Sequence, residues 1–457
     1  MDWGKAKNDL TEIFDSAVKR VTPYAILQKQ LSLTGNTLKI KTPFVEKEFD
    51  LSKFNKILVT GAGKATASMA KGLESVLGDK IDSGIISVKY GYTEKLSKVQ
   101  MIESGHPVPD QNSVKASIEI ANLLKSSADE KTLIINLVSG GGSALLCLPY
   151  SDNNISLTLE EKQKLTKHML ECGAEIEEIN CIRKHVSGIK GGRFARLLYP
   201  ATCISLILSD IVGDPLESIA SGISVPDPTT YANVYSIMQK YDLLEKIPEN
   251  IKKLVLAGKE GKIDETPKKG DKVFEKVHNI LIGTNRMALL AAEEKAASLG
   301  YNTMILTSDI TGEAKEIAKF YSALGRNVTS FNSPIKKPAC IIAGGETTVT
   351  IKGKGKGGRN QEMALAFLEK IKQNPQNFSE IFFLSAGTDG SDGPTDAAGA
   401  YASVEILKAG EKMGIAPASF LANNDSYNYF KQTDGLLITG PTNTNVCDVQ
   451  LIIIDFS

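Results

Sequence analysis

Short apolar runs and longer amphipathic stretches alternate along the first half of the chain. Four runs rich in branched side chains predict strands at 56–60, 84–88, 132–138 and 203–209. The segments between them have helical spacing and predict helices at 64–77, 113–125, 158–172 and 185–198. The strands lack strict alternation of apolar and polar positions, as is typical of strands covered on both faces. This pattern predicts a three-layer α/β domain around a parallel sheet.

The second half begins with a change in composition. Residues 246–276 are rich in Lys, Glu, Gly and Pro, which predicts a solvated connection. The alternation then resumes with strands at 279–283 and 303–307 and helices at 284–299 and 311–324, and a last strand is expected at 448–455. Two short runs, 339–343 and 347–352, flank Gly344-Gly345-Glu346 and allow either a parallel or an antiparallel connection. The chain of 457 residues exceeds what one core usually supports, so we expect two domains, 1–245 and 246–457, the second with a mixed sheet.

Composition narrows the class of protein. The chain carries 53 basic and 53 acidic side chains and has no basic stripe, which argues against a nucleic-acid partner. Charged residues interrupt the first 20 positions and no apolar run has membrane-spanning length, so neither a signal peptide nor a membrane span is expected. The six cysteines lack metal-binding spacing, which indicates reduced thiols and a cytoplasmic protein.

Glycine clusters beside lone charged residues carry the candidate chemistry. Gly61-Ala62-Gly63-Lys64 joins a predicted strand to a helix, where free backbone N–H groups favour an anion. Lys64 gains nothing from the helix dipole in the first turn, which favours a functional role over a solvated lysine in a tight turn. Thr66 stands where a dinucleotide fingerprint would need its last glycine.

A second cluster follows the strand at 132–138. Ser139-Gly140-Gly141-Gly142-Ser143 contains more glycine than a helix cap requires and predicts a phosphate-binding loop, although Ser143 could also simply cap a helix. Arg183-Lys184-His185 begins a locally cationic stretch that continues to Lys190-Gly191-Gly192-Arg193. For Lys184 an anion site and a solvated helix start remain open alternatives.

Acidic residues follow two other strands. Asp210 and Asp214 are either turn formers or ligands of a nucleotide-bound Mg²⁺, which needs only one or two protein carboxylates. Asp389 and Asp392 lie in a segment that superficially resembles a calcium loop. Ala400 occupies its twelfth position in place of the bidentate Glu, so Asp389 is interpreted as a general base or metal ligand.

The segment 352–362 has the glycine spacing of a P-loop. Arg359-Asn360 replaces the Lys-Ser/Thr pair that a P-loop needs, so we reject that assignment and expect a mobile cationic loop that enters a helix near Asn360. The planar guanidinium of Arg359 can bind two oxygens at once, which suits it to a phosphate or a carboxylate.

Taken together and in order along nearly the whole chain, these segments resemble the glycerate 2-kinase family, whose C-terminal half is the MOFRL domain. The matching stretches are 61–65, 139–145, 183–185 with 190–192, 209–228, 282–292, 344–362, 387–400 and 440–446. The sequence departs from the family at Ser221-Gly222-Ile223, where proline usually follows the glycine.

The resemblance implies a Rossmann-like N-terminal domain and a smaller C-terminal domain that phosphorylate D-glycerate to 2-phosphoglycerate in a cleft between them, with ATP and Mg²⁺. Lys64 and Arg359 correspond to the family's catalytic cations, and Asn285 falls in a matching stretch and joins the nucleotide-binding candidates. Glu346, Asn360 and Asp392 are further pocket candidates. The expected ligands are D-glycerate and a nucleotide, and oligomerisation is left open. The alternatives are an NAD(P)-dependent hydroxypyruvate reductase and a non-catalytic regulator that binds a phosphometabolite.

Overall fold

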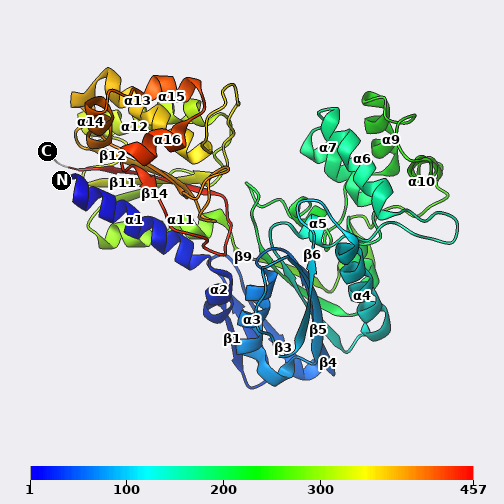
Figure 1. Cartoon of the computed structure of the whole chain (residues 1–457). Helices are drawn as coiled ribbons and strands as arrows, with labels where there is room; N and C mark the ends of the chain where they lie inside the picture. The colour runs from blue at the N-terminus through cyan, green and yellow to red at the C-terminus, as the bar shows by residue number, and fades with distance from the viewer. Residues whose placement is uncertain (1, 456–457) are drawn as a thin grey trace. The chain divides into compact units, whose positions relative to one another are not determined.

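The computed structural model describes residues 2–455, which form two compact units (Figure 1). The larger unit comprises Pro23–Ser209 and Asp214–Ile282. The smaller unit comprises Asp210–Gly213, Gly283 onward, and the residues before Pro23. Met1, Phe456 and Ser457, at the ends of the two expected domains, lie outside the described residues.

A six-stranded sheet forms the centre of the larger unit. Its order is β6 (Val99–Ser104), β5 (Ser83–Lys89), β4 (Lys56–Ala62), β7 (Thr132–Val138), β8 (Thr202–Leu208) and β9 (Val277–Gly283). The pairings from β6 through β8 are parallel, and every residue of β7 is buried. The predicted parallel sheet is therefore confirmed. Helices α3 (Thr66–Leu77), α4 (Gln111–Ser127), α5 (Gly142–Leu145) and α8 (Arg193–Leu198) accompany it, as do α2 (Pro23–Gln30) and a small antiparallel sheet of β1 (Leu31–Thr34), β2 (Thr37–Lys41) and β3 (Glu46–Asp50).

Four further helices of the larger unit share one hydrophobic cluster: α6 (Leu159–Glu171), α7 (Ile176–His185), α9 (Tyr231–Lys240) and α10 (Glu249–Lys259). Helix α10 lies where a solvated connection was expected, because Ile251, Leu254 and Val255 are buried at helical spacing. The expected boundary between residues 245 and 246 thus falls inside this cluster. The helix expected at 185–198 is also wrong: α7 ends at His185, and α8 begins only after the left-handed Gly191 and Gly192.

The smaller unit has a mixed sheet, as expected. Its order is β10 (Asn302–Ile305), β11 (Ala339–Gly345), β15 (Asp448–Ile454), β12 (Ile381–Gly387), β13 (Gly399–Ala402) and β14 (Leu436–Leu437). Only the β10–β11 pairing is parallel. The segment 347–352 contributes no strand, and Thr348 forms only an isolated bridge with Glu313. The helices are α11 (Asn285–Ser298), α12 (Ala314–Phe331), α13 (Arg359–Gln373), α14 (Val404–Lys412), α15 (Pro417–Ala422) and α16 (Ser426–Gln432).

The N-terminal helix α1 (Trp3–Arg20) belongs to the smaller unit. Its apolar side, which includes Leu10 and Phe14, is buried, and the helix packs along α11 (Figure 1). Trp3 stacks on Phe382 with ring centroids 6.1 Å apart. Hydrophobic burial of this amphipathic face explains why the two ends of the sequence share one unit.

No helix between residues 2 and 455 combines the length and apolar character that a membrane crossing requires.

Candidate active site

The two glycine clusters predicted in the first half of the chain form one structure in the larger unit. The Lys64 N–H donates to the Gly140 carbonyl at 2.9 Å, and the Ala65 N–H donates to the Ser139 hydroxyl at 3.0 Å. Gly63 has a φ of 150°, and a Cβ there would lie 2.0 Å from the Ser139 Oγ. Gly61 lies within β4, where a Cβ would meet the Leu137 carbonyl. The close approach of the turns therefore requires glycine.

The Lys64 side chain lies beside the second turn. Among the described residues 2–455 its ammonium group has no hydrogen-bond or ion-pair partner. The pKa of His106 is lowered to about 4, mainly by burial and secondly by the charge of Lys64. The His106 ring lies against Gly141, where an added Cβ would come within 2.9 Å of it. Lys64 thus lies beside the His106 imidazole and the glycine turn.

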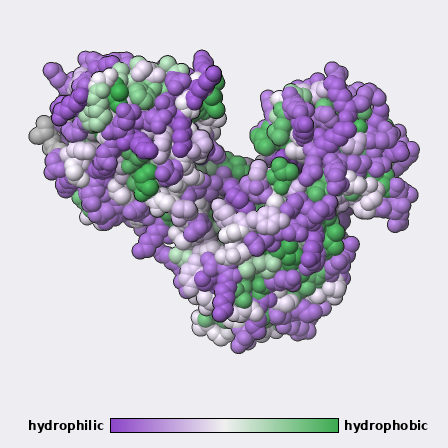
Figure 2. Space-filling model, viewed as in Figure 1, coloured by the Kyte–Doolittle hydropathy of each residue, from purple (hydrophilic) through white to green (hydrophobic). Residues whose placement is uncertain are grey.

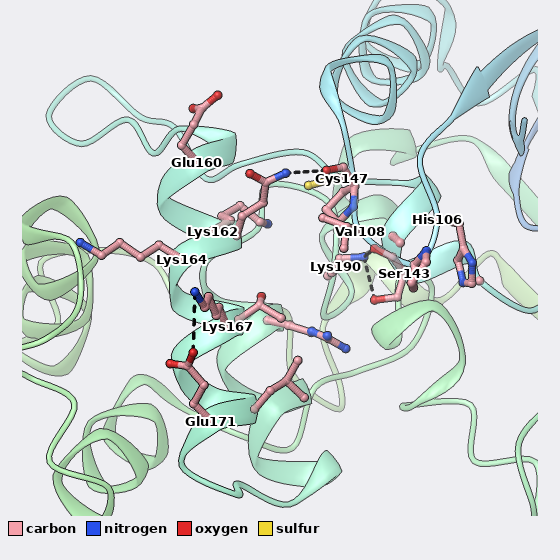
Figure 3. Close-up of a pocket in the computed structure, with 18 residues that line it drawn as sticks. His106, Val108, Ser143, Cys147, Glu160, Lys162, Lys164, Lys167, Glu171 and Lys190 are labelled. Carbon is pink, nitrogen blue, oxygen red and sulfur yellow. Dashed lines mark hydrogen bonds and ion pairs between the residues drawn. The ribbon is translucent and has the colours of Figure 1, made fainter. Parts of the chain in front are cut away.

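A cavity of about 870 Å³ opens beside this turn (Figure 3). Its walls are α6 and the loop 106–109, and the Gln163 side chain of α6 donates to the Pro109 carbonyl at 2.7 Å. Gly141 and Ser143 line it together with Cys147. In Figure 3, Ser143 lies between Lys190 and His106. The cavity therefore adjoins the turns that were predicted to bind phosphate.

The cavity lining contains five basic and two acidic side chains: Lys162, Lys164, Lys167, Arg183, Lys190, Glu160 and Glu171. Lys190 donates to the carbonyls of Ser143 at 2.6 Å and Leu146 at 3.0 Å, and burial, then the charge of Lys162, lowers its pKa to about 7. Lys162 donates to the Val186 carbonyl at 3.1 Å, and burial lowers its pKa as well. Within the described chain no carboxylate forms an ion pair with Lys162, Arg183 or Lys190, whereas Lys167 pairs with Glu171 at 3.7 Å. The basic side chains of the lining therefore outnumber the acidic ones.

Lys184, the residue proposed from sequence for an anion, lies elsewhere. Its ammonium is buried in an ion pair with Asp227 at 3.3 Å. It does not line the cavity, whereas the preceding residue, Arg183, does. Burial lowers the pKa of Arg183, and its guanidinium has no hydrogen-bond or ion-pair partner between residues 2 and 455.

A second set of candidates meets around Arg359 in the smaller unit. The guanidinium binds both carboxylate oxygens of Asp448, at 2.6 and 2.9 Å, and one oxygen of Glu346 at 2.9 Å. Burial raises the pKa of Glu346; the charge of Arg359 opposes this shift, and Asp448, Asp210 and Asp389 reinforce it. Arg359, Asp210, Glu346 and Asp389 therefore form one charged cluster. Asp448, buried at the start of β15, was not predicted.

Three other candidates hold the backbone of the smaller unit together. Asp392 accepts from the N–H groups of Asn360 and Gln361 at the start of α13. The Asn360 side chain accepts from the Ser385 hydroxyl at 2.6 Å. Asn285 donates to the carbonyls of Val446 and Asp448, both at 2.8 Å. All three side chains are buried, and their hydrogen bonds lie within the smaller unit.

Side chains of the segment 423–425 bond to the backbone of the cationic loop before Arg359. Asn424 accepts from the N–H groups of Lys352 and Gly353, Asn423 accepts from that of Lys354 and Asp425 from that of Lys356. These side chains replace the hydrogen bonds that a regular element would supply, and the mobility of the loop stays a prediction.

The two aspartates proposed as metal ligands fall in different units. Asp210 belongs to the charged cluster of the smaller unit. Asp214 belongs to the larger unit and has a φ of 52°, a left-handed conformation that turn residues adopt. Within residues 2–455 no group of three or more His, Cys, Asp or Glu side chains is arranged to hold a metal ion.

Comparison with known proteins assigns the chain to a family. Residues 9–256 match a domain of unknown function, DUF4147, and residues 339–448 match the MOFRL family. The glycerate 2-kinase of Pyrococcus horikoshii is 37% identical over 439 residues, which cover 96% of this chain and 95% of the relative. The D-glycerate 2-kinase of Thermotoga maritima is 41% identical over 402 residues, 87% of this chain and 91% of the relative.

A crystal structure of glycerate kinase from Thermotoga maritima superposes with a TM-score of 0.86 at 37% identity and covers 99% of this chain and all of its own. A relative from Agrobacterium vitis, 36% identical over 458 residues, is provisionally named a hydroxypyruvate reductase. That relative matches as much of the chain as the kinases do, but the kinase name is shared by relatives from two organisms and by a solved structure. The chain is therefore a member of the glycerate kinase family, with a DUF4147 domain followed by a MOFRL domain.

Proposed function

We propose that the protein is a glycerate 2-kinase that transfers the γ-phosphoryl group of ATP to the 2-hydroxyl of D-glycerate. The observation that carries this proposal is the cavity beside two interlocked glycine turns, in whose lining basic side chains outnumber acidic ones. Phosphoryl transfer depends mainly on positioning and on stabilisation of negative charge, and this part of the larger unit supplies both. The names of the family members support the same reaction.

Each of three candidate residues has a separate role in the proposed reaction. Lys64, whose ammonium has no partner in the described chain, stabilises charge on the phosphoryl group as it moves. Arg359, fixed by Asp448 and Glu346, supplies the second cation. Asp389, half-buried in the same cluster, accepts the proton of the substrate hydroxyl. The hydroxyl oxygen bonds to the γ-phosphorus while the bond from that phosphorus to ADP breaks.

We further propose that Mg²⁺ accompanies the nucleotide. Burial raises the pKa of Glu346, and the negative charges of neighbouring carboxylates, among them Asp210 and Asp389, raise it further. Carboxylate oxygens suit Mg²⁺, which takes one or two of them together with phosphate oxygens, so Asp210, a metal candidate from the sequence, fits as its ligand. When bound, the ion would neutralise charge on the phosphates.

A cytoplasmic location is part of the proposal. All six cysteines are free thiols, and five of them are buried, as suits a reducing compartment.

The test is a coupled assay for ADP with protein, ATP, Mg²⁺ and D-glycerate, followed by NMR of the product. Glycerate-dependent ADP release and a phosphorus coupling to the C2 proton are expected. Oxidation of NADH or NADPH by hydroxypyruvate, without ADP release, would instead establish the reductase alternative. Absence of both reactions, with binding retained, would favour the regulator.

A further inference from the structure

A second, smaller cavity of about 240 Å³ lies within the smaller unit. Residues of α12, α13 and α15, three helices of this unit in Figure 1, line it together with parts of two loops. The lining consists of Lys315, Thr350, Lys352, Glu362, Leu421, Ala422 and Asn424. None of the site candidates from the sequence is among these residues, so the cavity is separate from the proposed kinase chemistry.

Glu362 brings a buried carboxylate to this cavity. The residue is only 4% exposed, and burial raises the pKa of its carboxyl group. The Asn424 side chain donates to one carboxylate oxygen at 2.9 Å, and the other oxygen has no hydrogen-bond partner within residues 2–455. A buried carboxylate is costly unless a donor or a positive charge compensates it, so this oxygen points to a ligand with a positively charged donor.

An unpaired group of the opposite charge lines the same cavity. The Lys352 ammonium forms neither a hydrogen bond nor an ion pair with any described residue, and thus does not pair with Glu362. Lys315 is already paired with Glu313 at 3.4 Å. Glu313 also accepts from the N–H and the hydroxyl of Thr350. Glu362 and Lys352 are therefore the two charged groups of the lining that a ligand can pair with.

The volume and the rest of the lining narrow the class of ligand. A water molecule takes up about 30 Å³ of the liquid, so the cavity has room for roughly eight non-hydrogen atoms. Pockets for drug-sized ligands are larger, roughly 300–1,000 Å³. Leu421 and Ala422 add apolar side chains beside the charged groups. Figure 2 shows hydrophobic areas interspersed among the hydrophilic surface of the smaller unit. A small ligand with two opposite charges and an apolar part suits such a lining.

We propose that this cavity binds a small aliphatic α-amino acid, with its ammonium group on Glu362 and its carboxylate on Lys352. The side chain of the amino acid lies against Leu421 and Ala422. Such a molecule carries one charge of each sign at neutral pH, so a single ligand pairs with both groups. L-valine matches the available volume.

The test is a ligand-observed NMR titration of the whole protein at pH 7. L-valine is compared with isovalerate, which lacks the amino group, and with isobutylamine, which lacks the carboxylate. We expect L-valine to bind about 10- to 100-fold more tightly than either, as is typical when a hydrogen bond to a charged group is lost. Glu362→Gln should weaken the binding of L-valine by a similar factor, because the amide keeps the shape but not the charge.

Lys352→Met is the second variant. Its side chain is exposed and has no partner in the described chain, so the fold should be unaffected while the affinity for L-valine falls about tenfold. Glu316→Gln is the matched control, because Glu316 is exposed on α12, binds Lys319 and lies outside the lining; it should bind L-valine like the wild type. Unchanged affinity in Lys352→Met would overturn the proposal, as would equal binding of isovalerate or isobutylamine, or no binding of L-valine by the wild type.

Discussion

Lys190 shows what burial does to a single charged residue. The residue is 3% exposed and its ammonium contacts three oxygens, two of them backbone carbonyls near the glycine turn, yet burial lowers its pKa from 10.5 to about 7. The folded protein therefore releases the proton of Lys190 at a lower pH than the unfolded chain does. Between these two pKa values the unfolded state binds more protons, so stability rises with pH.

Replacement of Lys190 by methionine should remove this dependence. Between pH 6.5 and 8.5 the free energy of unfolding of the wild type, minus that of Lys190→Met, should increase by about 1–2 kcal/mol. Urea unfolding at the two pH values measures it, and the subtraction cancels groups that both proteins share. A constant difference would show that Lys190 has an ordinary pKa.

Lys64 should matter for turnover rather than for folding, because its ammonium contacts no other described residue. We expect Lys64→Met to lower kcat by about 10²- to 10³-fold, as loss of one charge-stabilising group commonly does, with unchanged thermal unfolding. Lys71→Met is the control. Lys71 lies on α3 and forms a surface ion pair with Glu94, and its replacement should leave kcat at the wild-type value. Near-normal turnover of Lys64→Met in the ADP assay would refute its catalytic role.

At the scale of elements, the turn after β4 depends on a glycine. An alanine at Gly63 would place its Cβ 2.0 Å from the Ser139 Oγ and would need a φ of 150°. Gly63→Ala should therefore separate the two glycine turns, destabilise the protein by more than about 2 kcal/mol and abolish most activity. Urea unfolding and the ADP assay measure the two effects.

Gly35→Ala is the matched control for this substitution. Gly35 also has a positive φ, 60°, but a Cβ there would meet no atom within 4 Å. Its cost should be that of backbone strain alone, about 1 kcal/mol, with normal turnover. Equal losses in the two variants would show that the contact with Ser139 is unimportant.

The strands of the parallel sheet were predictable because buried parallel strands are continuous apolar runs, as in β7. Helix α10 was missed because its few apolar residues stand among lysines, and their burial depends on α9, which composition does not reveal. In the site, the glycine turns were evident, but the choice between Arg183 and Lys184 was not. Adjacent residues of a helix point about 100° apart, and the sequence does not show which face meets a cavity.

Pairings across long stretches of sequence were equally hidden. Arg359 and Asp448 are 89 positions apart and meet only because α13 and β15 begin near one another. The same holds for α1, whose amphipathic face gives no sign that its partner is α11. Sequence therefore indicated elements and local turns, whereas tertiary packing determined which charged groups became partners.

At the scale of the whole molecule, α1 makes the smaller unit depend on the start of the chain. Phe14 of α1 is fully buried, so Phe14→Ala should destabilise this unit by about 3–5 kcal/mol. Trp3, the only tryptophan, lies against Phe382 and Tyr401, so its fluorescence reports unfolding of this unit. The transition should shift to lower urea in Phe14→Ala. It should stay in place in Lys19→Ala, which changes an exposed residue of the same helix.

The position of α1 also has a consequence for biosynthesis. Helix α1 is translated long before α11, against which it packs, because α11 begins at Asn285, after the last residue of the larger unit. The larger unit can fold during this interval, whereas the apolar face of α1 has no partner to cover it. A nascent chain of intermediate length therefore exposes the apolar face of α1 to chaperones.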